Sequence, residues 1–336
     1  MEERLDALTH VIGGTPMMAI DYTWRGEPRT TYVKCEYLNF TGSIKDRMAF
    51  NILREAYVTG MLHEGDTIAE ATSGNTGISF AALGRALGHP VIIFMPDWMS
   101  QERVKLIQSF GADITPITRQ QGGFLGSIEY SEKLAASRDD VFLPQQFSNS
   151  ANCRAHYLAT GPELLRQLRG LDLEPDGFVA GVGTGVTVMG TGTYLKEQLP
   201  SVRVYAVEPA ESPTLSTGHK VGFHRIQDIS DEFIPAVMNF AMIDDIIGVS
   251  DGDAILMAQR LASELGLGVG ISSGCNFLAA VVAQNNLGGK AVVVTVFCDD
   301  NKKYLSTSLL SEEPVHDAYL SPLISLQSIR SFPGVA

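Results

Sequence analysis

The chain has 336 residues, of which 45% are hydrophobic, and it contains 33 glycines and 15 prolines. This composition is typical of a folded protein with one large or two ordinary domains, and it excludes a disordered chain. The 25 lysines and arginines are outnumbered by 38 aspartates and glutamates, which gives a net charge of −13. Such a charge repels nucleic acid and anionic membranes, so we expect neither as a partner.

The sequence also bears on compartment and metal content. Its apolar runs, such as residues 291–297, are far shorter than the ~18 residues of a membrane span. The first ten residues carry acids and lack the apolar core of a signal peptide. The four cysteines form no Cys-x-x-Cys pair, and the seven histidines show no metal-ligand spacing. We therefore expect a cytoplasmic protein with reduced thiols and no metal site.

An apolar run, a turn rich in Gly, Ser or Thr, and a helical pattern follow one another repeatedly along the chain. The first series predicts strands at 67–71, 90–96 and 113–117, with helices over 78–88 and 101–111, the second capped by Ser100. The later series predicts strands at 178–182, 202–209 and 292–299, with a helix over 188–199. This order indicates an α/β fold with parallel sheets buried on both faces.

Two stretches lack such a pattern. Residues 145–156 are polar and without periodicity, so they are a candidate link between two α/β lobes. The segment after Thr307 has no strong pattern, and we assign no chemistry to it. The chain contains no internal repeat and no low-complexity segment, which excludes a solenoid or a propeller.

Turns that follow strands are the candidate sites, because open α/β sheets bind ligands at the carboxyl ends of their strands. The turn GVGTGVT at 181–187 opens a helix, and its backbone N–H groups suit a phosphate. The turn TSGNTG at 72–77 offers hydroxyls and a carboxamide, which suit a small anion such as a carboxylate. A third turn, GISSG at 270–274, offers paired serines. Each turn alone is also compatible with ordinary helix capping.

The turn at 181–187 has a competing interpretation. GVGTGV before a strand that ends at Glu208 is similar to a dinucleotide-binding fingerprint, which would indicate an NAD-dependent oxidoreductase. Val186 stands at the sixth position of this pattern. A small residue is needed there for the helix to pack on the strand, so Val186 argues against that class.

Lys45 lies between a turn that contains Gly42 and a helical pattern whose apolar residues face a core. A lysine held at such a junction, near a phosphate site, is able to form a Schiff base with a phosphorylated aldehyde. The alternative is a lysine that caps its own turn and pairs with Asp46.

Taken together, six segments resemble the fold type II pyridoxal-phosphate enzymes of the cysteine synthase and cystathionine β-synthase family, and are most similar to O-acetylserine sulfhydrylases. They are NFTGSIKDR at 39–47, TSGNTG at 72–77, QFSNSANCRAHY at 146–157, GVGTGVT at 181–187, GISSG at 270–274 and DDNKKYLST at 299–307. The resemblance, which covers about residues 10–310, implies two open twisted α/β lobes with pyridoxal 5′-phosphate between them. The lobes would be residues 46–150, smaller and mobile, and residues 1–45 with 151–310, followed by a C-terminal tail at 311–336.

The resemblance also implies roles for individual residues. Lys45 would carry the cofactor as an internal aldimine and, once freed by substrate, move the Cα proton. The other implied cofactor contacts are Asn75 to the 3′-oxygen, Ser272 to the pyridine nitrogen, and Gly183, Thr184, Gly185, Val186 and Thr187 to the phosphate. The implied contacts to the substrate carboxylate are Thr72, Ser73, Asn75 and Thr76, assisted by Gln146.

A serine opposite the pyridine nitrogen cannot hold a full pyridinium, so the ring is a weaker electron sink than one facing an aspartate. This favours loss of a β-leaving group to give an α-aminoacrylate, which a thiol or sulfide then attacks. We expect β-replacement at an L-serine- or L-cysteine-type amino acid, and specifically cysteine synthase activity, which converts O-acetyl-L-serine and sulfide to L-cysteine and acetate. The alternative starts from L-cysteine, releases hydrogen sulfide, and forms lanthionine, cystathionine or pyruvate.

Some positions depart from the family pattern. Val186 replaces a usual glycine, and if that position needs a positive φ, strain there would weaken phosphate binding. Asp231 and Glu232 stand where related enzymes tend to have small residues, and Asp231 is a candidate base for an incoming thiol. Arg225 is a candidate contact for a phosphate-bearing donor. The family further implies a homodimer, and a catalytically inactive member that acts as a binding partner is the remaining alternative.

Overall fold

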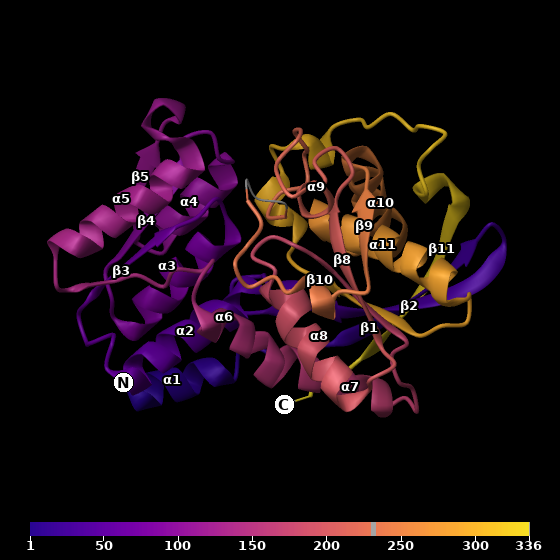
Figure 1. Ribbon diagram of the computed structural model, residues 1–336, viewed down its shortest axis with the longest axis horizontal. Coiled ribbons are helices and arrows are strands. Elements are labelled where there is room, and N and C mark those ends of the chain that lie inside the picture. Colours follow the sequence, from indigo (N-terminus) through magenta and orange to yellow (C-terminus); the bar gives the residue numbers. More distant parts are fainter. Residues whose placement is uncertain (230–232, 336) are drawn as a thin grey trace. The chain divides into compact units, whose positions relative to one another are not determined.

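The structure is a computed structural model that describes residues 1–229 and 233–335. The chain forms two compact units, each of which is described by itself (Figure 1). The first unit consists of Met1–Gly13 and Asn39–Asn152, and the second of Gly14–Leu38 and Cys153–Ala336. None of the helices in the described part of the chain is both long and apolar enough to cross a membrane.

The first unit is built on a four-stranded parallel sheet in the order β5-β4-β3-β6. Its strands are β3 (Thr67–Ala71), β4 (Val91–Pro96), β5 (Asp113–Ile117) and β6 (Val141–Phe142). Its helices are α1 (Glu2–Thr9), α2 (Lys45–Thr59), α3 (Asn75–Leu87), α4 (Gln101–Ser109) and α5 (Gly123–Ser137), with a 3₁₀ turn at Arg119–Gln121. Both α3 and α5 pack on β3 and β4. Every residue of β3 is therefore buried, as expected for a central parallel strand.

The second unit is built on a seven-stranded sheet in the order β11-β1-β2-β10-β7-β8-β9. Its strands are β1 (Met17–Trp24), β2 (Glu27–Cys35), β7 (Gly177–Gly181), β8 (Arg203–Pro209), β9 (Asp245–Val249), β10 (Val293–Phe297) and β11 (Ile324–Phe332). The five strands from β2 to β9 in this order are parallel. Their amino-terminal ends therefore lie on one side of the sheet, and their carboxyl-terminal ends lie on the opposite side.

Helix α11 organises the core of the second unit. The helices of this unit are α7 (Gly161–Arg169), α8 (Val186–Gln198), α9 (Thr214–Thr217), α10 (Asp251–Leu265) and α11 (Ile271–Leu287). Along the chain, the two units are joined by α6 (Ser150–Ala155) and a π-helix at His156–Thr160. Short 3₁₀ turns lie at Glu36–Leu38, Phe240–Met242, Asn301–Tyr304, Ser308–Leu310 and Ser321–Leu323. α11 packs on β7 and β10 and against α10. Phe277 and Leu278 of α11 are completely buried there with Val179 of β7 and Val293 of β10.

The predicted strands and helices lie where the apolar pattern placed them, but the sheet of the second unit is not wholly parallel. β1 pairs antiparallel with both β2 and β11. β11 lies in the segment after Thr307, for which no element was expected. Most of its residues are exposed, so this edge strand carries no apolar alternation that a sequence pattern could detect. The polar stretch 145–156 also contains a helix, α6, which is too short for its period to be recognised.

Candidate active site

The turn after β7 has the shape of a phosphate cradle in the second unit. Gly185 has a φ of 80° and is the N-cap of α8, a helix of 13 residues. A Cβ on Gly185 would lie 2.6 Å from Met238 Sδ, and a Cβ on Gly183 would overlap the backbone carbonyl oxygen of Asp228. Gly185 therefore requires glycine for its backbone conformation, and Gly183 requires it for its close approach to another backbone segment.

The backbone N–H groups of this turn are available to a ligand. Among the residues that the structure describes, those of residues 183–187 donate to no acceptor, whereas the N–H of Met189 donates to Gly185 O at 3.0 Å. Five N–H groups thus lie at the positive end of the α8 dipole without a partner in the described part of the chain. Such an arrangement suits a phosphate monoester.

The first turn of α11 is tied to the ends of two strands. Asn276 Oδ1 accepts a hydrogen bond of 2.8 Å from Gly181 N, and Asn276 Nδ2 donates one of 2.9 Å to Val296 O. Ser273 Oγ accepts from Cys298 N at 3.1 Å. Ser272, one helical turn before Asn276, is 3% exposed and makes no side-chain hydrogen bond within the described part of the chain. Ser272 is thus available to a ligand, and Asn276 is a supporting residue that the sequence analysis missed.

Thr184 and Thr187 differ in their surroundings. Thr184 is 4% exposed, and Thr187 Oγ1 lies 3.5 Å from Nε2 of the buried His156. His156 Nδ1 in turn lies 3.0 Å from Thr160 Oγ1. The structure therefore adds His156 to the surroundings of the turn, although the sequence analysis gave it no role.

The strain expected at Val186 is absent. Val186 is the first residue of α8 and has no positive φ; the left-handed conformation falls on Gly185 instead. Its side chain is buried, with 1% exposure. Its backbone N–H remains free within the described residues, so we correct the expectation that a β-branched residue weakens the turn.

Glu208 does not serve as a ribose-binding acid. Its carboxylate accepts a hydrogen bond of 2.7 Å from Leu215 N and a further one from the Ser216 hydroxyl. It thereby caps the short helix α9, and its side chain is 2% exposed. The acidic residue of the apparent dinucleotide fingerprint is already occupied within the protein, which removes the structural basis for that interpretation.

In the first unit, the turn 72–77 joins β3 to α3 and contains the four residues predicted to bind a carboxylate. Thr76 Oγ1 donates a hydrogen bond of 2.7 Å to Gln146 Oε1, and Gln146 Nε2 donates one of 3.0 Å to Ala71 O. Thr72 Oγ1 accepts from Gly74 N at 3.1 Å. The structure therefore brings Gln146 to this turn, as predicted, although 70 positions separate it from Thr76.

The turn has a further support and free donors. Arg103 of α4, which is 1% exposed, donates from Nη1 to Ser73 O at 3.2 Å. The backbone N–H groups of Ser73 and Thr76 donate to no residue in the described ranges. Asn75 is the first residue of α3 and is 4% exposed. Free N–H groups at the start of a helix suit an anion such as a carboxylate. Arg103, like Asn276, is a supporting residue that the sequence analysis missed.

Lys45 is the first residue of α2, and its backbone N–H donates to Ser43 Oγ at 3.3 Å. Its ammonium group has no hydrogen-bond or ion-pair partner among the described residues. The pairing with Asp46 does not occur: the Asp46 carboxylate accepts bonds of 2.6 Å from the hydroxyls of Thr41 and Ser79. Within the described residues, the lysine side chain therefore neither caps its own turn nor pairs with Asp46.

The acidic pair at 231–232 and Arg225 were the remaining candidate site residues. Asp231 and Glu232 lie outside the described residues. Arg225 forms ion pairs with Asp251 at 2.6 Å and with Glu313 at 2.5 Å, and these carboxylates raise its pKa. It is thereby engaged within the second unit and is a poor contact for a phosphate-bearing donor. Within the described ranges, no group of three or more His, Cys, Asp or Glu residues is arranged to hold a metal ion.

These donors fit pyridoxal phosphate. The five free N–H groups at 183–187 match a phosphate ester, the hydroxyl of Ser272 is a neutral partner for a ring nitrogen, and the amine of Lys45 is free to condense with an aldehyde.

Comparison with known proteins agrees with this fit. The family model for "Pyridoxal-phosphate dependent enzyme" matches residues 8–299. A cysteine synthase of Staphylococcus aureus is 41% identical over 310 residues, which are 92% of this chain and 98% of the relative.

Solved structures of two enzymes from other bacteria extend the comparison. A hydrogen sulfide-producing enzyme of Fusobacterium nucleatum superimposes with a TM-score of 0.97 at 52% identity, covering 99% of this chain and 100% of that one. An aspartate-to-asparagine mutant of that enzyme was crystallised with an α-aminoacrylate intermediate. The O-acetylserine dependent cystathionine β-synthase of Helicobacter pylori is 34% identical, with a TM-score of 0.82 over 90% of this chain and 98% of that one. The chain belongs to the pyridoxal-phosphate dependent enzymes, within their cysteine synthase group.

Proposed function

We propose that this enzyme uses L-cysteine as the donor in a β-replacement reaction and releases hydrogen sulfide. The bond between Cβ and sulfur breaks, sulfide leaves, and the sulfur of a second thiol forms the new bond to Cβ. The Cα proton is removed and later returned, so no oxidant or reductant is needed. The observation that carries the proposal is the 52% identity, over nearly the whole of both chains, with the hydrogen sulfide-producing enzyme.

The residues of this chain have separable tasks in that reaction. Bound pyridoxal phosphate supplies the electron-withdrawing ring that makes the Cα–H bond acidic. We propose that the N–H groups of residues 183–187 bind its phosphate, Ser272 its ring nitrogen and Asn75 its 3′-oxygen. Lys45 holds the cofactor through Nζ, and the same amine, tethered near Cα, removes and returns the proton there.

The turn 72–77 orients the amino-acid substrate in this proposal. The backbone N–H groups of Ser73 and Thr76, which have no acceptor among the described residues, donate hydrogen bonds to the carboxylate. The hydroxyl of Thr72 lies in the same turn. Gln146 fixes the turn from outside through Thr76 and Ala71. Binding the carboxylate at a buried helix start fixes the rotation of Cα, which aligns the bond to be broken with the ring.

We further propose Asp231 as the base for the incoming thiol, a role that would favour thiols over sulfide as nucleophile. The test compares Asp231→Asn with Glu232→Gln as a matched control. With O-acetyl-L-serine as the donor, so that attack by sulfide also gives a net product, Asp231→Asn should lose most of its rate with a thiol such as homocysteine while keeping its rate with sulfide. Glu232→Gln should keep both rates. Equal losses with the two nucleophiles would remove Asp231 from this role.

A second candidate, cysteine synthase activity with O-acetyl-L-serine and sulfide, is favoured by the 41% identity with the cysteine synthase relatives. The two reactions share their first proton removal and differ in the leaving group. The test supplies each donor separately to the purified holoenzyme, with Lys45→Ala as the inactive control, and measures free sulfide and thioether products. Sulfide release from L-cysteine with a larger kcat/KM than O-acetylserine consumption is expected. A preference for O-acetylserine would establish the second candidate instead.

We also propose a homodimer, as the family implies, and a cytoplasmic location. The four cysteines, Cys35, Cys153, Cys275 and Cys298, are free thiols, which is consistent with a reducing compartment. Sedimentation of the holoenzyme tests the dimer, and a mass of about 36 kDa would contradict it.

A further inference from the structure

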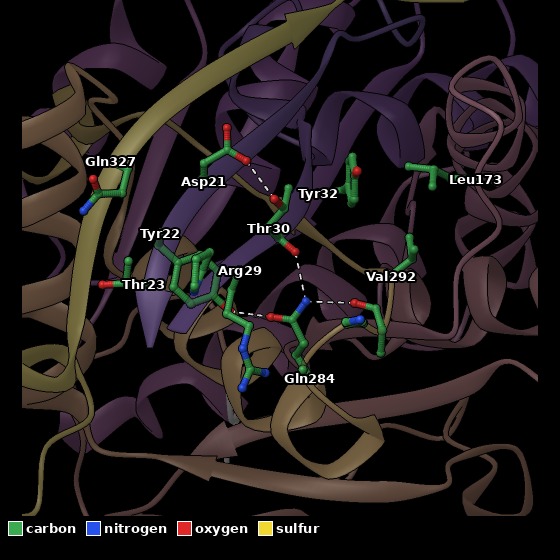
Figure 2. Close-up of a pocket in the computed structure, with 14 residues that line it drawn as sticks. Asp21, Tyr22, Thr23, Arg29, Thr30, Tyr32, Leu173, Gln284, Val292 and Gln327 are labelled. Atoms are coloured by element: carbon green, nitrogen blue, oxygen red, sulfur yellow. Dashed lines mark hydrogen bonds between the residues drawn. The ribbon is translucent and has the colours of Figure 1, made fainter. Parts of the chain in front are cut away.

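A cavity of about 600 Å³ lies in the second unit, near the amino-terminal ends of the parallel strands (Figure 2). Val292, just before β10, and Leu173, before β7, line it together with Tyr32 of β2. The turn 181–187 lies at the opposite, carboxyl-terminal ends of the parallel strands, where β7 ends. The cavity contains none of the residues assigned to the cofactor or to the amino-acid substrate, and its volume suits a small organic ligand.

One wall of the cavity is held by a connected set of hydrogen bonds (Figure 2). Tyr22 Oη donates to Gln284 Oε1 at 2.6 Å. Gln284 Nε2 donates to Thr30 O at 3.0 Å and to Ala291 O at 2.8 Å. Because one carboxamide joins β1, β2 and the segment before β10, the wall is preformed rather than assembled on binding.

Arg29 lines this cavity and has hydrogen-bonding capacity left over. Its side chain is only 10% exposed, and Nη2 forms an ion pair of 2.9 Å with the exposed Glu27. Nη1 is buried and has no partner among the described residues. A Cβ on Gly289 would overlap the guanidinium group, so the arginine occupies this position because residue 289 is glycine. A buried guanidinium nitrogen without an acceptor is costly, and an acceptor supplied by a ligand would relieve that cost.

The charges around the cavity favour an anion. Lys290 adds a second cation to the lining. The acidic lining residue, Asp21, accepts hydrogen bonds of 2.9 and 3.0 Å from Arg330, and these lower its pKa. Its charge is thus balanced outside the cavity. Tyr32, Leu173 and Val292 add apolar surface, which suits the body of an organic molecule.

We propose that this cavity is a second ligand site, which binds a small organic carboxylate through the guanidinium group of Arg29, whose Nη1 has no acceptor among the described residues. Lys290 adds attraction, and the body of the ligand packs against Tyr32 and Leu173. The exposed Glu27 competes with the ligand, since it already holds the other terminal nitrogen of the same guanidinium. This site does not depend on the proposed function, because neither the cofactor turn nor the substrate turn contributes to it.

The test uses benzoate as the probe and the tryptophan next to the cavity as the reporter. Trp24 follows Thr23, a lining residue, and the other tryptophan, Trp98, belongs to the first unit. In Trp98→Phe holoenzyme, benzoate should change the Trp24 fluorescence saturably, whereas neutral benzamide should not. Adding Arg29→Met should weaken binding about tenfold or more, because a hydrogen bond to a charged group is lost.

Two further variants keep the test sensitive if Arg29→Met unfolds the second unit. Glu27→Gln should tighten benzoate binding about threefold, because it removes the competing carboxylate. Lys290→Met should weaken it while leaving the fold intact, since only the lining cation is removed. Binding that is unchanged in all three variants, or an equal response to benzamide, overturns the proposal. An equal response to inorganic phosphate also overturns it, since the cavity would then select charge alone.

Discussion

Thr76 donates its hydroxyl hydrogen bond to Gln146 Oε1 at 2.7 Å, and both side chains are almost completely buried. The same carboxamide donates to Ala71 O at the end of β3. Asn152 Nδ2 holds the backbone carbonyl of Gln146 at 2.8 Å. A single side chain thus fixes both ends of the turn 72–77, the end of the strand and the start of the helix.

Gln146→Ala should therefore raise the KM for the amino-acid substrate about tenfold, because the turn loses two buried hydrogen bonds. The cofactor content should stay unchanged, since the cradle at 183–187 belongs to the second unit. Steady-state kinetics and the visible absorbance of the holoenzyme measure the two effects. Gln108→Ala, on the exposed face of α4, is the matched control and should behave like the wild type. An unchanged KM in Gln146→Ala would show that the turn keeps its shape without the carboxamide.

Val186→Gly should not improve cofactor binding, although glycine is usual at this position in the family. The position is helical, so glycine relieves no strain and instead removes a buried side chain. We expect the free energy of unfolding of the apoenzyme to fall by about 2–3 kcal/mol, because apolar burial is lost and glycine has a lower helix propensity. Chemical denaturation and cofactor titration check this. Substantially tighter cofactor binding in the variant would contradict an unstrained Val186.

Gly183→Ala should weaken cofactor binding by about tenfold or more, because its methyl group would displace either the turn or the backbone at Asp228. Gly170→Ala is the matched control. A Cβ there meets its nearest atoms at 3.4 Å, and the backbone is right-handed helical. Titration of both apoenzymes with pyridoxal phosphate compares them. Equal affinities would mean that the turn has room that the structure does not show.

Asn276→Ala should destabilise the second unit by about 2 kcal/mol, since it leaves the N–H of Gly181 and the carbonyl of Val296 without their partner. Because Gly181 leads directly into the cradle, the cofactor affinity should fall as well. Asn276→Asp keeps an acceptor for Gly181 but faces Val296 O with a second acceptor, so it should recover only part of the loss. Full stability and affinity in Asn276→Ala would show that α11 does not position the cradle.

The buried carboxyl of Glu70 should make the free energy of unfolding of the first unit depend on pH. Burial raises the pKa of its carboxyl to about 8, from 4.5 in the unfolded chain. Between these values the folded state binds a proton that the unfolded state has released, so stability falls as the pH rises through that window. The slope contributed by one such group is about −1.4 kcal/mol per pH unit. Glu70→Gln should remove this slope, and the exposed Glu64→Gln should not; denaturation at several pH values between 5 and 8 measures it.

The positions of the turns could be read from the sequence because each turn follows a buried parallel strand, and such strands are visible as short apolar runs. The residues within the turns were recognisable because glycine and hydroxyl residues recur there in a fixed order. By contrast, Asn276 and Arg103 act through hydrogen bonds to backbone groups that are distant in the chain. No periodicity marks such residues, so only the folded chain reveals them.

The sequence by itself determined the α/β class, the turns at the ends of β3 and β7, and the lysine at the start of α2, because local propensity and strand burial leave a direct trace in residue order. The tertiary structure decided whether Val186 is strained, whether Glu208 and Arg225 are free, and where Arg29 keeps an unused donor. Those outcomes depend on which groups meet across the fold, since a polar atom is available to a ligand only when no other part of the chain has already bound it.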